Sequence, residues 1–133
     1  MKIAILGYGT VGRGVDQIIS EHVDGVEVTR ILELPDRLSD PRMTSSFDEI
    51  LADEKIELVV ECMGGVEPAR TYIMAALQSG RHVVTSNKAV VAAHFAEFAA
   101  ASVASGAGLF VEAAVGGGLE VYGVGALAET VAF

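Results

Sequence analysis

Three glycines near the start of the chain have the spacing of a phosphate-binding turn. The segment GYGTVG, residues 7–12, fits the pattern G-x-G-x-x-G between an apolar run and a helical pattern. Gly7 would permit a tight turn, Gly9 would let the backbone approach a pyrophosphate, and Gly12 would let a helix pack closely on a strand. The positive start of that helix attracts phosphate. The pattern predicts dinucleotide binding, with a structural glycine turn as the alternative.

An acidic residue about 20 positions beyond such a turn can accept hydrogen bonds from an adenosine ribose diol. Glu33 stands near that distance, at the end of the second apolar run, and favours NAD weakly. Arg37 follows closely and could instead face the 2′-phosphate of NADP. An ordinary exposed charge at a strand end is the alternative for Glu33.

Two further segments place polar or flexible residues directly after apolar runs. In ECMGGVEP, Met63 and Gly64 could line a cofactor through their backbone, whereas Cys62 is expected to be a small buried residue. In VVTSNKAVV, the residues after the run are Thr85, Ser86, Asn87 and Lys88. Lys88 could donate a proton to a carbonyl, polarise it, or hold a ribose or phosphate. The alternative is a solvated lysine at a helix start.

Alternating apolar runs and helical patterns must position these residues. We expect strands over residues 2–6, 26–34, 58–62, 82–85 and 109–115. Helical patterns follow four of these strands, including one that ends near Asp53 and one over residues 90–105, and residues 35–45 read as a loop. Strands separated by helices imply parallel crossovers. The expected fold is a single α/β domain of the Rossmann type, with a doubly wound, mainly parallel sheet.

Three residues indicate where the middle helices begin and end. Ser46 and Glu49 have the spacing of a capping box. Pro68 suits the first turn of the next helix, and Gly80 suits its C-terminal end.

Composition excludes several classes of protein. The 133 residues suit one hydrophobic core, and a formal net charge of −9 without a basic run argues against nucleic-acid binding. With Cys62 as the single cysteine, no internal disulfide can form, which fits a reducing, cytoplasmic setting. No membrane span is expected, and the three histidines do not suggest a triad or a zinc site.

Four blocks of the sequence together resemble the nucleotide-binding region of homoserine dehydrogenase. The blocks are GYGTVGRGV, VVECMGGVEPAR, AALQSGRHVVTSNKAVVAAH and VEAAVGGG, in the order and with the approximate spacing of that family, over residues 2–118. The resemblance implies NAD(P)-linked interconversion of homoserine and aspartate semialdehyde, in the pathway to threonine and methionine. It also implies cofactor contacts by Thr10, Val11, Met63, Gly64, Thr85 and Ser86, and Gly123 is a further cofactor-binding candidate.

The same resemblance assigns two further kinds of residue. Lys88 matches the family's lysine for cofactor binding and hydride-transfer chemistry. A monovalent cation, typically Na⁺, would be held largely through carbonyl oxygens at Glu112, Val115, Gly117 and Leu119. Oxygen ligands suit such a hard ion.

Two departures from the family pattern stand out. Leu34 and Pro35 occupy the place where the family often has an arginine for the NADP 2′-phosphate. We expect the family's substrate and dimerisation domain to be missing after Gly118, since residues 123–127, beginning with Gly123, resemble the segment that returns from it. Residues 1–118 are therefore expected to form the NAD(P)-binding domain, and 119–133 a short bridge and returning segment. Leu119-Glu120 is either a natural bridge or, as we favour, the scar of an engineered deletion.

Three functions remain open from the sequence. The first is a cofactor-binding domain of a homoserine dehydrogenase with little or no turnover on its own. The second is a free-standing dinucleotide-binding regulatory or sensor module that needs a partner. The third, and the least favoured, is a small dehydrogenase that uses Lys88 on another carbonyl. Apolar surface at residues 119–124 would also allow a homo-oligomer through the C-terminal edge.

Overall fold

The computed structural model describes residues 1–112, 118–123 and 126–132 of the chain. The strands are β1 (Lys2–Leu6), β2 (Glu27–Leu32), β3 (Met43–Thr44), β4 (Ile56–Glu61), β5 (His82–Thr85), β6 (Leu109–Glu112), β7 (Gly118–Gly123) and β8 (Ala126–Ala132). The helices are α1 (Thr10–His22), α2 (Phe47–Ala52), α3 (Ala69–Gln78) and α4 (Lys88–Ser105), with a 3₁₀ turn at Pro35–Arg37. None of these helices is long and apolar enough to cross a membrane.

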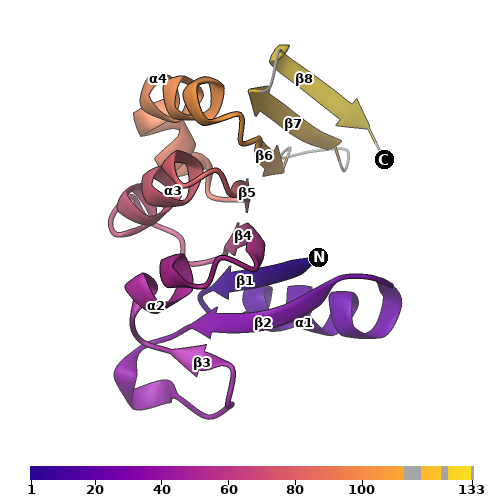
Figure 1. Ribbon diagram of the computed structural model, residues 1–133. Coiled ribbons are helices and arrows are strands. Elements are labelled where there is room, and N and C mark those ends of the chain that lie inside the picture. Colours follow the sequence, from indigo (N-terminus) through magenta and orange to yellow (C-terminus); the bar gives the residue numbers. More distant parts are fainter. Residues whose placement is uncertain (113–117, 124–125, 133) are drawn as a thin grey trace.

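The strands form one sheet in the order β3-β2-β1-β4-β5-β6-β7-β8. All neighbours from β3 to β6 are parallel, whereas β7 and β8 continue the sheet antiparallel. The chain runs outward from β1 to β3 and then returns to β4 on the other side of β1, so the order reverses between β1 and β4 (Figure 1). This confirms the predicted doubly wound, mainly parallel sheet, and it places the ligand crevice of such folds at the β1–β4 boundary.

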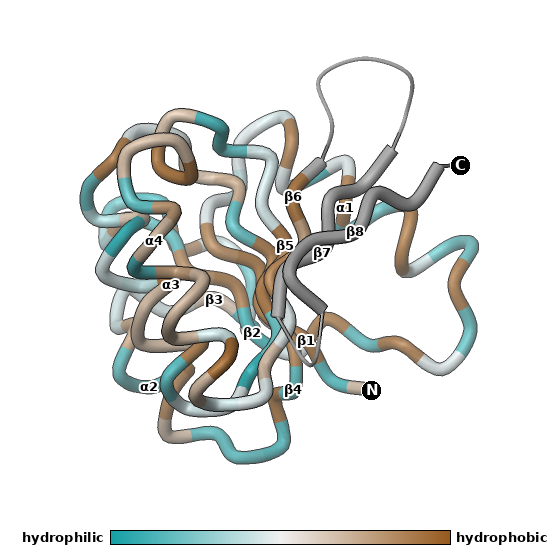
Figure 2. Tube along the Cα trace, turned by 90° about the horizontal axis from the view of Figure 1, so that it is seen from above, coloured by the Kyte–Doolittle hydropathy of each residue, from teal (hydrophilic) through white to brown (hydrophobic). Residues whose placement is uncertain are grey.

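Helices cover the sheet on both faces. Alternate residues of β1 point to opposite sides: Ala4 and Leu6 join a core with α2, α3 and α4, whereas Ile3 and Ile5 pack toward α1. Figure 2 shows α2, α3 and α4 together on one side of the strands, and α1 on the other. Strand β1 is therefore buried on both faces, and the parallel strands β1–β6 have their carboxyl ends at one common edge.

The segment between β2 and α2 is more regular than the expected loop over residues 35–45. Besides the 3₁₀ turn, it contains β3, which pairs parallel with β2 through Ile31↔Met43 and Leu32↔Thr44. Arg42 holds this segment, since its guanidinium donates to Asp40 and, across the chain, to Asp16 of α1. A long-range ion pair of this kind leaves no signal in local sequence patterns.

The capping box predicted for α2 is wrong, although the helix itself lies where expected. Ser46 makes no side-chain cap, and the Glu49 carboxylate accepts a hydrogen bond from the Thr44 hydroxyl at 2.6 Å. Thr44 Oγ1 in turn accepts the Ser46 N–H. Thr44 is buried in β3, and its hydroxyl uses the Glu49 carboxylate as an acceptor in place of the expected helix cap.

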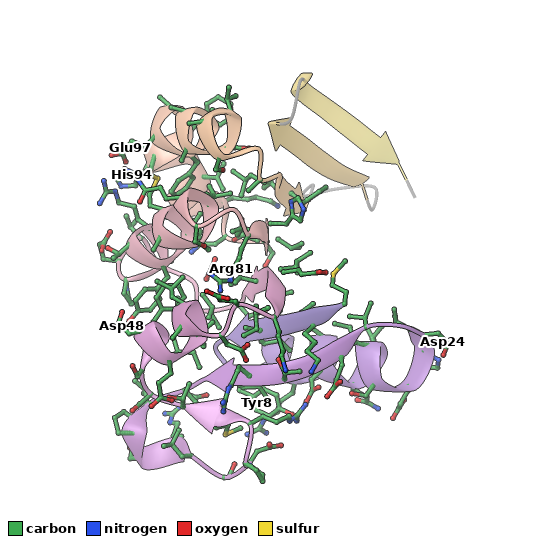
Figure 3. All side chains as sticks on the ribbon, in the orientation of Figure 1. Tyr8, Asp24, Asp48, Arg81, His94 and Glu97 are labelled. Atoms are coloured by element: carbon green, nitrogen blue, oxygen red, sulfur yellow. The ribbon has the colours of Figure 1, made fainter. Side chains whose placement is uncertain are left out.

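The ends of α3 agree with the sequence. Pro68 precedes the first helical residue, and Gly80 follows the helix with φ of 85° and donates its N–H to the Leu77 carbonyl. The next residue, Arg81, is buried between α2 and β4, where it donates to the carbonyls of Leu51, Asp53 and Ile56 (Figure 3). These carbonyls lie at the end of α2, in the following turn and at the start of β4, so Arg81 joins the three segments.

The C-terminal part of the chain adds the β7–β8 hairpin to β6. Of the strand expected over 109–115, residues 109–112 form β6, and 113–115 lie outside the described residues. The supposed bridge, Leu119-Glu120, lies within β7, opposite Glu112 and Val111. Its origin and the proposed boundary at residue 118 stay predictions.

Candidate functional site

The glycine-rich turn has the close packing that its pattern predicts. Gly7 follows β1 with φ of 93° and donates its N–H to the Leu32 carbonyl at 2.9 Å. A Cβ on Gly12 would lie 2.0 Å from the Gly7 carbonyl oxygen, so no larger residue fits there. A Cβ on Gly9 would meet no atom within 4 Å, which leaves the space above its backbone open. The three glycines thus have three different physical roles, and Gly9 is the one with open space beside its backbone.

The first turn of α1 is open to a ligand. Gly9, Thr10 and Val11 are exposed, Gly9 provides no side-chain cap, and no acidic residue lies in that turn. The first N–H groups of a helix have no partner within the helix and carry partial positive charge. Thr10 and Val11 therefore lie where a pyrophosphate would accept hydrogen bonds from these N–H groups.

Glu33 lies beside this turn at the start of the crevice. One oxygen of its carboxylate accepts the Tyr8 N–H at 3.2 Å, and the other accepts the Leu34 N–H at 2.8 Å. A cavity of about 410 Å³ brings together the turn, Glu33 and the segment after β4, including Gly7, Gly9, Cys62 and Met63. A smaller cavity of about 330 Å³ adjoins it, between Thr10, Arg13, Glu33 and Arg37. The carboxylate of Glu33 and the guanidinium groups of Arg13 and Arg37 thus line the same cavity.

Tyr8 is tied to the body of the domain on the β2–β3 side of the sheet (Figure 3). Its hydroxyl donates to Asp16 at 2.6 Å, and Asp16 also pairs with Arg42 at 2.9 Å. The Arg42 guanidinium lowers the pKa of Asp16, and the hydrogen bond to Asp16 raises the pKa of Tyr8. Arg42 also lowers the pKa of Asp40 to about 2. This ion-pair cluster fixes the glycine-rich turn relative to α1 and β3.

A second network lies where β4 and β5 end. Glu61 is buried, and its carboxylate accepts hydrogen bonds from the Thr85 hydroxyl at 2.7 Å and from the N–H groups of Met63 at 2.7 Å and Gly64 at 3.1 Å. Between Glu61 and Met63, burial raises the pKa of the Cys62 thiol to about 11. Cys62 is therefore a poor nucleophile. It is half-buried and lines the cavity, whereas the sequence led us to expect a buried residue.

Asn87 connects this network to α4. Its N–H donates to Thr85 Oγ1 at 2.9 Å, its Nδ2 donates to the Gly65 carbonyl at 2.5 Å, and its Oδ1 accepts the Val90 N–H at 3.2 Å. The helix consequently begins at Lys88, whose side chain is exposed beside the exposed Ser86. Thr85 is fully buried, so its hydroxyl holds the network together and does not face solvent.

Sequence reasoning missed the residues that hold the site in place. Glu61, Asn87, Asp16 and Arg42 make the hydrogen bonds just described. Glu61 and Asn87 lie in the two segments singled out from the sequence but had no role assigned to them, and Asp16 and Arg42 lie in neither segment. For Glu61 a signal existed, because a carboxylate at the end of an otherwise apolar strand needs hydrogen-bond donors. For Asp16 and Arg42, 26 residues apart, only the fold brings the partners together.

The C-terminal candidates are placed only in part. Glu112 and Leu119 are backbone partners across β6 and β7, and Gly123 ends β7 opposite Ala126. Val115 and Gly117 lie outside the described residues. Within the described ranges, no three His, Cys, Asp or Glu residues gather as a metal site.

The histidines have structural partners. His82 Nδ1 accepts the Gly108 N–H at 2.8 Å, and His94 pairs with Glu97 at 2.7 Å on the outer side of α4 (Figure 3). A hollow of about 660 Å³ near Glu54, Arg81 and His82 lies at the amino ends of the strands. Ligands of open α/β sheets bind at the carboxyl ends, so the cavity beside the glycine-rich turn is the candidate site.

Replacing Gly12 tests the close contact between α1 and β1. We expect Gly12→Ala to lower the free energy of unfolding by about 2 kcal/mol or more, because the added methyl group overpacks the contact, and to weaken dinucleotide binding. Gly14→Ala in the same helix is the matched control, since a Cβ there meets no atom within 4 Å. That variant should be as stable as the parent chain or more stable. Urea unfolding measures both, and equal stability of the two variants would contradict the packing argument.

The ion-pair cluster at Tyr8 predicts how stability depends on pH. The pKa of Asp40 falls from 3.8 to about 2 on folding, so its contribution is complete above the unfolded value and is lost as pH falls from 3.8 toward 2. Asp40→Asn should therefore destabilise the protein near neutral pH and make the acid decline less steep. Asp24→Asn, in the exposed turn after α1, is the control. The measurement is urea unfolding between about pH 6 and pH 2. A parallel decline in the free energy of unfolding of Asp40→Asn and of the parent chain would contradict this account.

Comparisons with known proteins agree on one family. Residues 7–112 match the NAD-binding domain of homoserine dehydrogenase. The homoserine dehydrogenases of Lactococcus lactis and Corynebacterium glutamicum are 35% and 37% identical to the chain over 91% of its length. A crystal structure of the S. aureus homoserine dehydrogenase superposes with a TM-score of 0.76 at 34% identity and covers 90% of this chain.

The chain spans about a third of the length of these relatives: 32% and 30% of the two sequences and 34% of the crystallised chain. The matched region includes the glycine-rich turn, Glu33, Met63, Gly64, Thr85 and Lys88, which confirms the sequence-based resemblance. Its ligand is accordingly a nicotinamide dinucleotide. The chain belongs to the family of homoserine dehydrogenase NAD-binding domains.

Proposed function

We propose that the chain holds the dinucleotide across the carboxyl edge of the sheet, with its two halves on either side of the β1–β4 boundary. The observation that carries this placement is the cavity that joins the glycine-rich turn, Glu33 and Met63 at the point where the strand order reverses. The pyrophosphate lies over Gly9 and the start of α1. The adenosine ribose lies toward Glu33, and the nicotinamide half lies toward Met63, Gly64 and the Ser86–Lys88 segment.

The preferred cofactor in this proposal is NAD. The Glu33 carboxylate is fixed by the N–H groups of Tyr8 and Leu34, and carboxylate oxygens accept hydrogen bonds from a ribose diol. A 2′-phosphate would bring a second negative charge to the same place. Arg13 and Arg37 line the adjoining cavity and oppose this effect, so the preference is a balance between one carboxylate and two exposed guanidinium groups.

The proposed reaction in a complete homoserine dehydrogenase is the interconversion of homoserine and aspartate semialdehyde. The dinucleotide supplies the hydride chemistry. Lys88 is placed at the nicotinamide side by the Asn87 cap of α4, where its ammonium group can hold a ribose hydroxyl or polarise a substrate carbonyl. Ser86, exposed beside it, adds a hydroxyl at the same edge.

Two further parts of the proposal concern the C-terminal strands. A Na⁺ ion would be held by carbonyl oxygens of Glu112, Val115, Gly117 and Leu119. Of these residues, Glu112 and Leu119 are backbone neighbours across β6 and β7. Self-association would use β8, which ends the order of described strands on that side of the sheet. The backbone groups of such an edge strand can pair with a second chain.

Calorimetry with each cofactor tests the role of Glu33. The parent chain should bind NAD more tightly than NADP, and Glu33→Gln should weaken NAD binding while NADP binding changes little or improves, because a negative charge beside the 2′-phosphate is removed. Asp36→Asn, in the exposed 3₁₀ turn, is the control and should leave the ratio unchanged. Tighter binding of NADP by the parent chain would overturn the preference.

An activity assay tests whether the 133-residue chain can catalyse the reaction alone. Hydride transfer requires substrate and dinucleotide in near-attack geometry, which needs a second wall for the site. We expect the chain to bind dinucleotide but to show little or no oxidation of homoserine, followed as NADH absorbance. Turnover comparable to that of a full-length homoserine dehydrogenase would refute this expectation.

A further inference from the structure

A buried carboxylate organises the edge where the nicotinamide half is proposed to bind. Glu61 is 1% exposed, and its hydrogen-bond donors are one hydroxyl and two backbone N–H groups. An ionised carboxylate away from water is stable only when such donors satisfy its oxygens. The two oxygens have different donors, since Oε1 accepts from the Thr85 hydroxyl of β5 and Oε2 accepts from the N–H groups of Met63 and Gly64.

The first consequence concerns the loop after β4. Gly64 and Gly65 have φ of 76° and 72°, a left-handed conformation that glycine adopts without strain. Because the N–H groups of Met63 and Gly64 point to Glu61, they are not offered to a ligand. The Gly65 carbonyl is likewise engaged by Asn87 Nδ2. Glu61 thereby sets both the path of this loop and the groups that it presents to the crevice.

The second consequence concerns Lys88. Thr85 Oγ1 donates to Glu61 and accepts the N–H of Asn87, and Asn87 caps the helix that begins at Lys88. A continuous set of hydrogen bonds therefore runs from Glu61 through Thr85 and Asn87 to the first turn of α4. By contrast, Glu33 and the glycine-rich turn lie at β1 and β2, and they exchange no hydrogen bond with Glu61 among those of the described residues.

We propose that Glu61 is a positioning residue for the nicotinamide half of the dinucleotide. It touches no ligand itself; it holds the Met63–Gly65 loop and the Asn87-capped start of α4 in one fixed relation. This inference rests on the proposed function, in particular on the placement of the nicotinamide at the ends of β4 and β5. It predicts that loss of the Glu61 carboxylate weakens binding of the nicotinamide half of the dinucleotide and leaves binding of the adenosine half unchanged.

The test compares NAD with ADP-ribose, which lacks the nicotinamide, by calorimetry on the parent chain and on Glu61→Gln. Glutamine keeps the size of the side chain but replaces one acceptor with an amide donor, which faces either the Thr85 hydroxyl or the two N–H groups. We expect NAD to bind roughly fivefold more weakly, the effect of about one lost hydrogen bond. ADP-ribose should bind as in the parent chain. The fluorescence of bound NADH, which reports on the nicotinamide, should shift toward that of free NADH.

Two sets of variants separate positioning from a general effect on the fold. Thr85→Val removes the hydroxyl and should reproduce the loss for NAD, whereas Thr85→Ser keeps the hydroxyl and should restore binding. Glu49→Gln removes the carboxylate of a similar pair, in which Thr44 Oγ1 donates to Glu49 at 2.6 Å on α2. Glu49 does not line the candidate cavity, so this variant should leave the affinities for both ligands unchanged.

Each result of these measurements either supports or contradicts the positioning role of Glu61. Equal weakening of NAD and ADP-ribose by Glu61→Gln, or no weakening of either, would overturn it while leaving the proposed function intact. A parent chain that binds neither ligand would overturn the proposed function, and the inference with it. Should Glu61→Gln fail to fold, the Thr85 pair decides: equal NAD affinity for the Val and Ser variants would reject the positioning role.

Discussion

The site depends on how closely α1 approaches the end of β1. With the Gly7 carbonyl only 2.0 Å from the place where a Cβ of residue 12 would lie, helix and strand are in backbone contact. This contact aims the first N–H groups of α1 at the space over Gly9. This also determines where the crevice lies. Strands β2 and β4 flank β1, so the segments that follow them, with Glu33 and Met63, leave the sheet on the two sides of β1.

Carboxylates stabilise this edge although its ligand is an anion. Asp16, Glu33 and Glu61 accept hydrogen bonds from the hydroxyl of Tyr8, from backbone N–H groups and from Thr85. Each carboxylate orders the turn or loop beside it; those of Asp16 and Glu61 are buried, whereas Glu33 also lines the cavity. The start of α1 and the exposed guanidinium groups of Arg13 and Arg37 supply positive charge beside the cavity. Much of the negative charge near the site therefore supports the protein backbone and is not presented to the phosphates.

The sequence predicts the parts of the structure that follow from local pattern. The parallel sheet, the role of Gly12 and the end of α3 at Gly80 follow from periodicity and from the backbone needs of glycine. The parts that it misses depend on tertiary partners. The Asp16–Arg42 pair joins the segment before β3 to α1, and Glu49 accepts a hydrogen bond from Thr44 where a helix cap is expected. The positions of the candidate residues could be predicted, but the network from Glu61 to Asn87 could not, because it joins residues that only the fold brings together.

Because β1 lies inside the sheet, its two edges are covered by strands that are synthesised at different times. Strand β1 pairs with β2 on one side, and its other edge is covered by β4 only after residues 56–61 have been synthesised. Until then β1 presents an unpaired apolar edge, the kind of surface through which partly folded chains aggregate. The crevice exists only after β4 has docked, so a nascent chain cannot recruit its ligand as an early folding aid. Binding can stabilise this domain only once the central strands have assembled.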